Sequence, residues 1–144
     1  MRLFREDTKI EALRRAPLFE GLSRNELEQL ARLAEDLEVD AGKVLTREGE
    51  SGREFFVILE GEVDVSRRGQ TIATRGAGDF IGEIAILEDI QRTATVTAKT
   101  PLRFFVLTAQ AFRSVVDEYP EVERKVLRTL ARRLAALSDD PSMA

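Results

Sequence analysis

The residues whose types could do chemistry lie together in the stretch Gly78–Val96. Glu83 and Arg92 stand there among small and apolar neighbours, and Gly76 and Gly82 allow the backbone to come close to a bound molecule. A glycine-rich approach, a one-turn helical start and a single arginine can bind one phosphate group. A carboxylate would repel a phosphate, so Glu83 must serve another part of the ligand. A sugar hydroxyl is the natural candidate, because a carboxylate accepts hydrogen bonds from it.

The composition excludes most catalytic chemistry. The 144 residues include no cysteine and no histidine. This removes thiol nucleophiles and disulfides, the commonest metal ligand and the usual general base. A metal-dependent enzyme with a β-roll would need a histidine cluster, and a phosphodiesterase would need metal ligands. We therefore expect no catalytic residue, no metal and no cofactor, and the chain is predicted not to be an enzyme.

The charge balance restricts the partners. Lysine and arginine number 22 and aspartate and glutamate 26, which gives a net charge of −4 and a pI of about 5.1. Such a balance argues against a chain that mainly coats nucleic acid or an anionic membrane. No apolar run approaches the roughly 18 residues of a transmembrane helix, and acidic residues near the start argue against a signal peptide. We predict a cytoplasmic protein with no nucleic-acid partner and no membrane partner.

The apolar pattern separates a helical beginning from a β-rich middle. Residues 8–34 have helical spacing, and Ser23-Arg-Asn-Glu26 is a capping box for the second helix. Residues 37–107 contain short β-branched and aromatic runs separated by turn signals, which is typical of about eight strands in a sandwich or roll. The apolar run Phe55–Leu59 suits a strand buried on both faces, and a helical fragment near Glu83–Leu87 interrupts the strands.

Residues 108–137 are predicted to be helical again. Thr108 is expected to cap a first helix, Tyr119-Pro120 marks a break, and Glu121–Leu137 forms a longer helix. Four leucines step along this helix: Leu127, Leu130, Leu134 and Leu137. They could form a dimer interface or the face that packs on the β-roll, and the pattern leaves both open. We predict one domain, residues 1–137, followed by a disordered tail, residues 138–144.

Five spaced segments together resemble the cyclic nucleotide-binding domain. These segments are Gly42 to Gly49, Phe55–Gly61, Gly78–Phe80, Gly82–Ala85 and Arg92–Ala94. The domain occurs in the bacterial catabolite activator, in regulatory subunits of cyclic-nucleotide kinases and in gated ion channels. The resemblance covers nearly the whole chain. It implies a mainly β fold, an eight-stranded antiparallel β-roll of the jelly-roll type with N-terminal helices and a long C-terminal helix.

The resemblance also implies the ligand-binding residues. Arg92 matches the arginine that pairs with the cyclic phosphate, and Glu83 matches the glutamate that accepts from the ribose 2′-hydroxyl. The backbone N–H groups of Gly82 and Ala85 match groups that face ribose or phosphate. The predicted set is Gly82, Glu83, Ile84, Ala85, Arg92, Thr93 and Ala94. The chain departs from the family at Gln91, where many members have proline.

Further residues are predicted around the base of the nucleotide. The candidates for the base pocket and its lid are Ile72, Ala73, Arg133, Leu137 and Ser138. By resemblance, the residue that covers the base lies late in the C-terminal helix, near Leu137 or Ser138, in the same chain or in a partner subunit. Arg133 could instead reach back toward Glu83.

The function implied by the resemblance is that of a cyclic nucleotide sensor with no chemistry of its own. Bound ligand would favour the arrangement in which the C-terminal helix closes over the base. Threonine at the position of Thr93 occurs in cyclic-GMP kinases and in some cyclic-AMP binders, and we favour cAMP over cGMP. The expected partners are the nucleotide, a second copy joined through the C-terminal helix, and an effector protein of unknown identity. The alternative is a β-roll that has lost nucleotide binding and serves as a protein-interaction domain.

Overall fold

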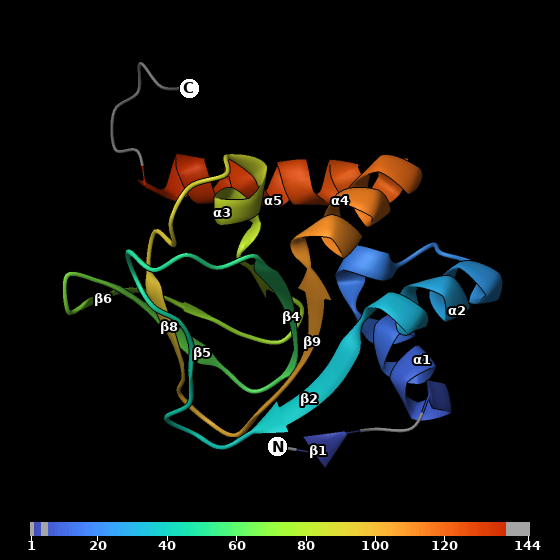
Figure 1. The fold of residues 1–144 in the computed structure, drawn as a ribbon, viewed down its shortest axis with the longest axis horizontal. Helices are drawn as coiled ribbons and strands as arrows, with labels where there is room; N and C mark the ends of the chain where they lie inside the picture. The colour runs from blue at the N-terminus through green and yellow to red at the C-terminus, as the bar shows by residue number, and fades with distance from the viewer. Residues whose placement is uncertain (1, 4–5, 138–144) are drawn as a thin grey trace.

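In the computed structural model, which describes residues 2–3 and 6–137, the strands form two antiparallel sheets flanked by helices (Figure 1). The elements in chain order are β1 (Arg2–Leu3), α1 (Glu6–Arg15), the 3-10 helix η1 (Pro17–Phe19), α2 (Arg24–Leu33), β2 (Glu35–Val39), β3 (Val44–Thr46), β4 (Glu54–Glu60), β5 (Val63–Arg67), β6 (Gln70–Arg75), β7 (Phe80–Ile81), α3 (Glu83–Leu87), β8 (Thr95–Ala98), β9 (Leu102–Thr108), α4 (Ala109–Glu118) and α5 (Pro120–Leu137). Strands β2 to β9 make an eight-stranded antiparallel roll, so the predicted fold class is confirmed. The sequence pattern did not predict β1.

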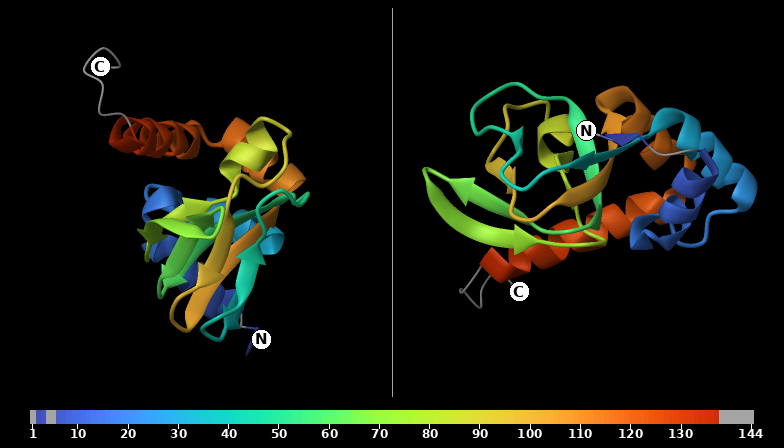
Figure 2. Two further views of the ribbon diagram at one scale, coloured as in Figure 1. Left: turned by 90° about the vertical axis from the view of Figure 1, so that its left-hand side faces the viewer. Right: turned by 90° about the horizontal axis from the view of Figure 1, so that it is seen from below.

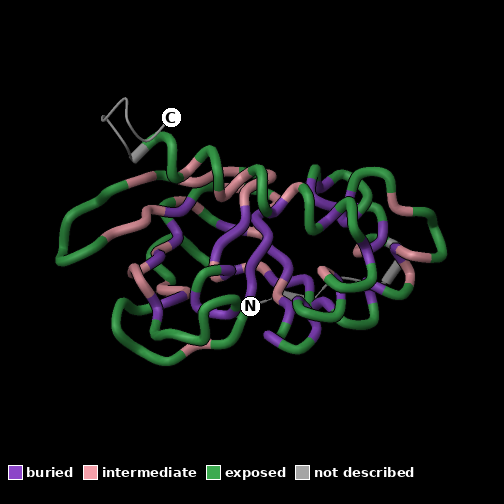
Figure 3. Tube along the Cα trace, turned by 90° about the horizontal axis from the view of Figure 1, so that it is seen from above, coloured by how far each residue is buried: buried purple, intermediate pink, exposed green. Residues whose placement is uncertain are grey.

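The two sheets enclose one apolar core, and the helices cover a second. One sheet has the strand order β1-β2-β9-β4-β7 and the other the order β3-β8-β5-β6. On β4, Phe55 and Val57 belong to the core shared with the helices, whereas Phe56 and Ile58 belong to the core between the sheets. Both faces of β4 are therefore buried, which is why its sequence is continuously apolar. Figure 3 shows buried stretches both in the middle of the molecule and in the part to its right.

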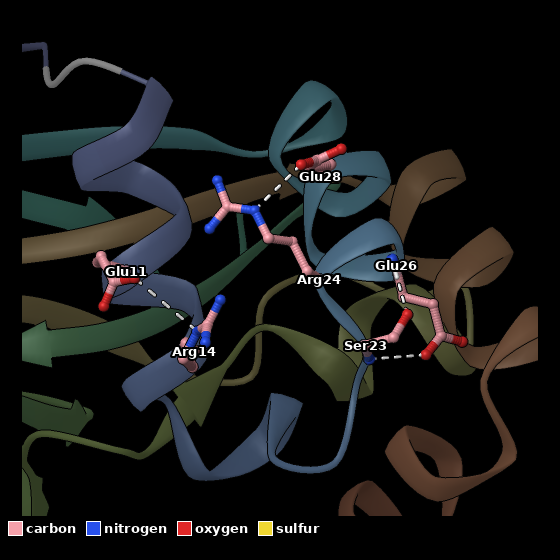
Figure 4. A network of polar contacts seen from close by, with 6 residues as sticks. All are labelled: Glu11, Arg14, Ser23, Arg24, Glu26 and Glu28. Atoms are coloured by element: carbon pink, nitrogen blue, oxygen red, sulfur yellow. Dashed lines mark hydrogen bonds and ion pairs between the residues drawn. The ribbon is translucent and has the colours of Figure 1, made fainter.

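The helix starts follow local capping rules. The Ser23 side chain accepts from the backbone N–H of Glu26, and the Glu26 side chain accepts from the backbone N–H of Ser23 (Figure 4). This reciprocal pair starts α2 as the sequence predicted. Thr108 caps α4 in a similar way, accepting from the N–H of Ala111 at 3.1 Å. The Thr108 cap fixes where α4 begins after β9, the last strand of the roll.

Helix α5 crosses one end of the roll (Figures 1 and 2) and packs against α4 and the 3-10 helix η1. It packs through Val122 and Val126, which are buried, and through Leu130, which is partly buried. Leu127 and Leu134 are 58% and 59% exposed. The predicted leucine seam is therefore divided between two faces of α5, and the dimer interface stays a prediction.

Two further sequence predictions concern the ends of the fold and the membrane. None of the helices in the described part of the chain is long and apolar enough to cross a membrane. The predicted tail, residues 138–144, lies outside the described residues, and Ser138 with it.

Candidate functional site

The site begins where β7 turns into the short helix α3. Gly82 has a φ of 100°, in the left-handed region that favours glycine. A Cβ atom on Gly82 would lie 2.5 Å from the backbone oxygen of Glu54 and 2.8 Å from Nη1 of Arg92. The absent side chain therefore leaves room for the arginine, and the turn directs Glu83 inward as the first residue of α3.

Arg92 lies buried in the loop before β8, with 6% of its surface exposed. Its backbone exchanges two hydrogen bonds with the β3–β4 loop: its carbonyl accepts from Gly49 and its N–H donates to Glu50, each at 2.9 Å. The side-chain Nη2 donates to the backbone oxygen of Glu54 at 2.8 Å. Burial lowers the pKa of the Arg92 guanidinium, while the negative charges of Glu54 and Glu83 oppose that shift. The guanidinium is thus held in place without an ion-pair partner among the described residues.

Glu83 is the second buried charge of the site, with 3% of its surface exposed. Its Oε1 accepts a hydrogen bond from Nη1 of Arg133 at 2.8 Å, and Nη2 of Arg133 donates to the backbone oxygen of Phe80 at 2.6 Å. Burial raises the pKa of the Glu83 carboxyl, and the charge of Arg133 is the largest effect that lowers it. One side chain from α5 therefore supplies the countercharge of Glu83.

Two buried polar atoms of the site have no partner. Among the described residues, Oε2 of Glu83 and Nη1 of Arg92 are the buried side-chain polar atoms that make no hydrogen bond. Buried polar groups in folded proteins are nearly always hydrogen-bonded, so each such exception needs an explanation. A ligand with a donor for the carboxylate and a negative acceptor for the guanidinium would satisfy both atoms.

The remaining predicted residues are placed differently with respect to this pair. Ala85 is buried in α3, whereas Ile84 is 41% exposed. Thr93 and Ala94 follow Arg92 directly and are partly buried. Ala85, Thr93 and Ala94 therefore stand next to the two charged residues along the chain, whereas much of the Ile84 side chain is turned toward solvent.

The residues predicted for the base pocket and its lid lie in different parts of the structure. Ala73 lies opposite Val65 in the β5–β6 pairing, while Ile72 falls at a register shift of that pairing and is 50% exposed. Arg133 is the α5 residue that reaches Glu83, the second of the two alternatives that the sequence left open. Leu137 is the last residue of α5, and Ser138 lies outside the described residues.

Sequence reasoning missed three contributors to the site. Gly52 abuts the Arg92 guanidinium, and the backbone oxygens of Glu54 and Phe80 accept from Arg92 and Arg133. Gly52 was visible only as part of a turn signal, and a backbone acceptor leaves no signal in residue type. The described residues show no group of histidine, cysteine, aspartate or glutamate side chains that could hold a metal ion.

Comparison with known proteins defines the family. A family model described as the cyclic nucleotide-binding domain matches residues 36–119. The chain is 30% identical over 129 residues to the CRP-like cAMP-activated global transcriptional regulator of Mycobacterium tuberculosis, covering 86% of this chain and 58% of the relative. It is 37% identical over 113 residues to the cAMP-dependent protein kinase regulatory subunit of Eremothecium gossypii, covering 78% of this chain and 25% of that subunit.

A solved structure supports the same relationship. The regulatory subunit of a cAMP-independent protein kinase A from Trypanosoma brucei superposes with a TM-score of 0.77 at 32% identity, covering 87% of this chain and 45% of that one. The chain belongs to the cyclic nucleotide-binding domain family. The named relatives are regulators or regulatory subunits, and this chain spans little more than half of the first and a quarter of the second.

Proposed function

We propose that this chain is a sensor that binds a 3′,5′-cyclic nucleotide and performs no chemistry on it. The observation that carries the proposal is the pair of buried, unpartnered atoms, Oε2 of Glu83 and Nη1 of Arg92. A cyclic phosphate has one negative charge and leaves only the 2′-hydroxyl free on the ribose. The phosphate accepts from Arg92 and the 2′-hydroxyl donates to Glu83, so one ligand satisfies both atoms.

The proposal assigns lesser roles to neighbouring groups. The backbone N–H groups at Gly82 and Ala85, at the start of α3, supply further donors to the phosphate or the ribose. The names of two relatives mention cAMP, which supports cAMP as the first nucleotide to test. The alternative function, a protein-interaction domain without ligand, gives no reason for two buried polar atoms without a partner at one site.

Ligand binding is coupled in this proposal to the position of α5. Arg133 occupies Oε1 of Glu83 and leaves Oε2 for the ribose, so α5 and the nucleotide share one carboxylate. A ligand can shift the position of α5 only as far as it binds one arrangement better than another. The shared carboxylate provides that difference, and an effector protein would detect the position of α5. A cytoplasmic location and the absence of catalysis remain predictions from the composition.

The proposal is tested by titration calorimetry with cAMP and cGMP on the parent chain and on Arg92→Ala. We expect saturable binding to the parent and a loss of affinity of about two orders of magnitude or more in Arg92→Ala, because the phosphate loses its countercharge and a charged hydrogen bond is worth about 1.5–3 kcal/mol. Arg124→Ala removes the same charge from an exposed position on α5 and should bind like the parent. No heat from either nucleotide at high micromolar concentration would refute the proposal.

A further inference from the structure

Arg75 is a cation beside the site that the proposed function leaves without a role. It is the last residue of β6 and is partly buried. In the antiparallel β5–β6 pairing, Arg75 lies opposite Val63 and Ala73 lies opposite Val65. Directly opposed residues share one face of a sheet, and both valines contact the core between the two sheets. Arg75 and Ala73 therefore lie on the face of β6 that is turned into the roll.

Arg75 acts on its neighbours through its charge alone. Within residues 2–3 and 6–137, its guanidinium has neither a hydrogen bond nor an ion-pair partner. The charge of Arg75 acts on both Glu83 and Arg133. Burial raises the pKa of the Glu83 carboxyl, and the positive charges of Arg133 and Arg75 lower it. The charges that act on Arg92 are those of Glu54 and Glu83. Arg75 is therefore close enough to Glu83 and Arg133 for its charge to act on both, and its place on β6 turns it into the roll.

We propose that Arg75 contacts the base of the bound nucleotide and donates hydrogen bonds to a base that carries a carbonyl oxygen. This inference rests on the proposed function. In this pose the phosphate lies at Arg92 and the 2′-hydroxyl at Glu83. The base is attached to the ribose carbon next to the one that carries the 2′-hydroxyl, so it lies on the side of Glu83, where the charge of Arg75 acts. A cation with no protein partner on that side is available to the base.

The chemistry of the guanidinium selects among purines. Its planar pair of N–H donors matches the adjacent O6 and N7 acceptors of guanine, whereas adenine presents an amino donor beside N7. Arg75 therefore gives guanine and hypoxanthine nucleotides a two-point contact, to O6 and N7, that cAMP cannot make. A site that accepts cAMP through Arg92 and Glu83 alone accepts cGMP as well, with Arg75 as an additional contact.

The test is calorimetry with cAMP, cGMP and cyclic inosine monophosphate on the parent, Arg75→Ala and Arg75→Lys. The inosine nucleotide keeps O6 and N7 and lacks the 2-amino group, so it separates the carbonyl contact from any contact to the guanine amino group. We expect Arg75→Ala to weaken cGMP and the inosine nucleotide by about tenfold to a hundredfold and cAMP by less than about threefold. Arg75→Lys keeps the charge without the planar pair of donors, and its losses should be intermediate.

A matched control and the other outcomes complete the test. Arg32→Ala removes one positive charge from the exposed last turn of α2 and should leave all three affinities unchanged. Equal losses of affinity for all three nucleotides in Arg75→Ala would show a general charge effect and overturn the inference. No loss of affinity for any nucleotide, or a loss for cGMP alone, would also overturn it. Parent protein that binds none of the three would refute the proposed function itself. Binding of cAMP alone would refute only the role of Arg75.

Discussion

At the scale of single residues, the position of the Arg92 guanidinium depends on two glycines. A Cβ atom on Gly52 would overlap Nε of Arg92 and lie 2.9 Å from Nη2, and one on Gly82 would lie 2.8 Å from Nη1. The φ angle of Gly52 lies outside the left-handed region, so alanine is compatible with the backbone there. We predict that Gly52→Ala displaces the guanidinium and weakens nucleotide binding by about tenfold or more, since a charged hydrogen bond is lost or bent. Calorimetry measures this directly.

The control for Gly52→Ala is another glycine. Gly69 has a φ of 77° and its added Cβ would meet nothing within 4 Å, so Gly69→Ala strains a hairpin without touching the site. It should lower the melting temperature and leave the affinity unchanged. In an Arg92→Ala background, Gly52→Ala should cause no further loss. Parent-like affinity in the single variant Gly52→Ala would show that Gly52 does not position the arginine.

At the scale of elements, one side chain joins α5 to the segment that runs from β7 into α3. Arg133 donates to Oε1 of Glu83 and to the backbone oxygen of Phe80, and its guanidinium carbon lies 4.8 Å from the centre of the Phe80 ring. We predict that Arg133→Gln loosens the C-terminal half of α5, so that its amide hydrogens exchange faster than in the parent. Nucleotide should increase the protection of α5 in the parent and not in the variant. Hydrogen-exchange mass spectrometry measures both effects.

The neighbouring arginine provides the control for that experiment. Arg132 is exposed, so Arg132→Gln removes the same charge from the same helix without breaking a contact of Arg133. It should exchange like the parent, with and without nucleotide. If Arg133→Gln keeps the full response of α5 to nucleotide, the ligand is not coupled to α5 through Glu83.

The same elements show what the sequence could predict and what it could not. The caps at Ser23 and Thr108, and the burial of both faces of β4, follow from residue types at short spacing, and the structure has all of them. The contacts of Gly52 with Arg92 join residues 40 positions apart, and nothing local in the sequence signals them. The division of the leucine seam was also unpredictable, because a helical pattern does not show where the roll ends beneath α5. The structure does not test the predicted bounds of the domain, residues 1–137.

At the scale of the whole molecule, α5 leaves an apolar face uncovered. Leu127 and Leu134 are more than half exposed and stand seven residues apart, so they lie on nearly one line of the helix surface. We predict that two copies associate through this line at micromolar concentrations. Leu127→Glu combined with Leu134→Glu should then yield monomers with an unchanged melting temperature, because neither side chain belongs to the core of its own chain.

Leu33→Glu alters a similarly exposed leucine on α2 and should leave the association intact. Sedimentation velocity over a range of concentrations decides the matter, and a parent chain that sediments as a monomer at every concentration would refute the dimer.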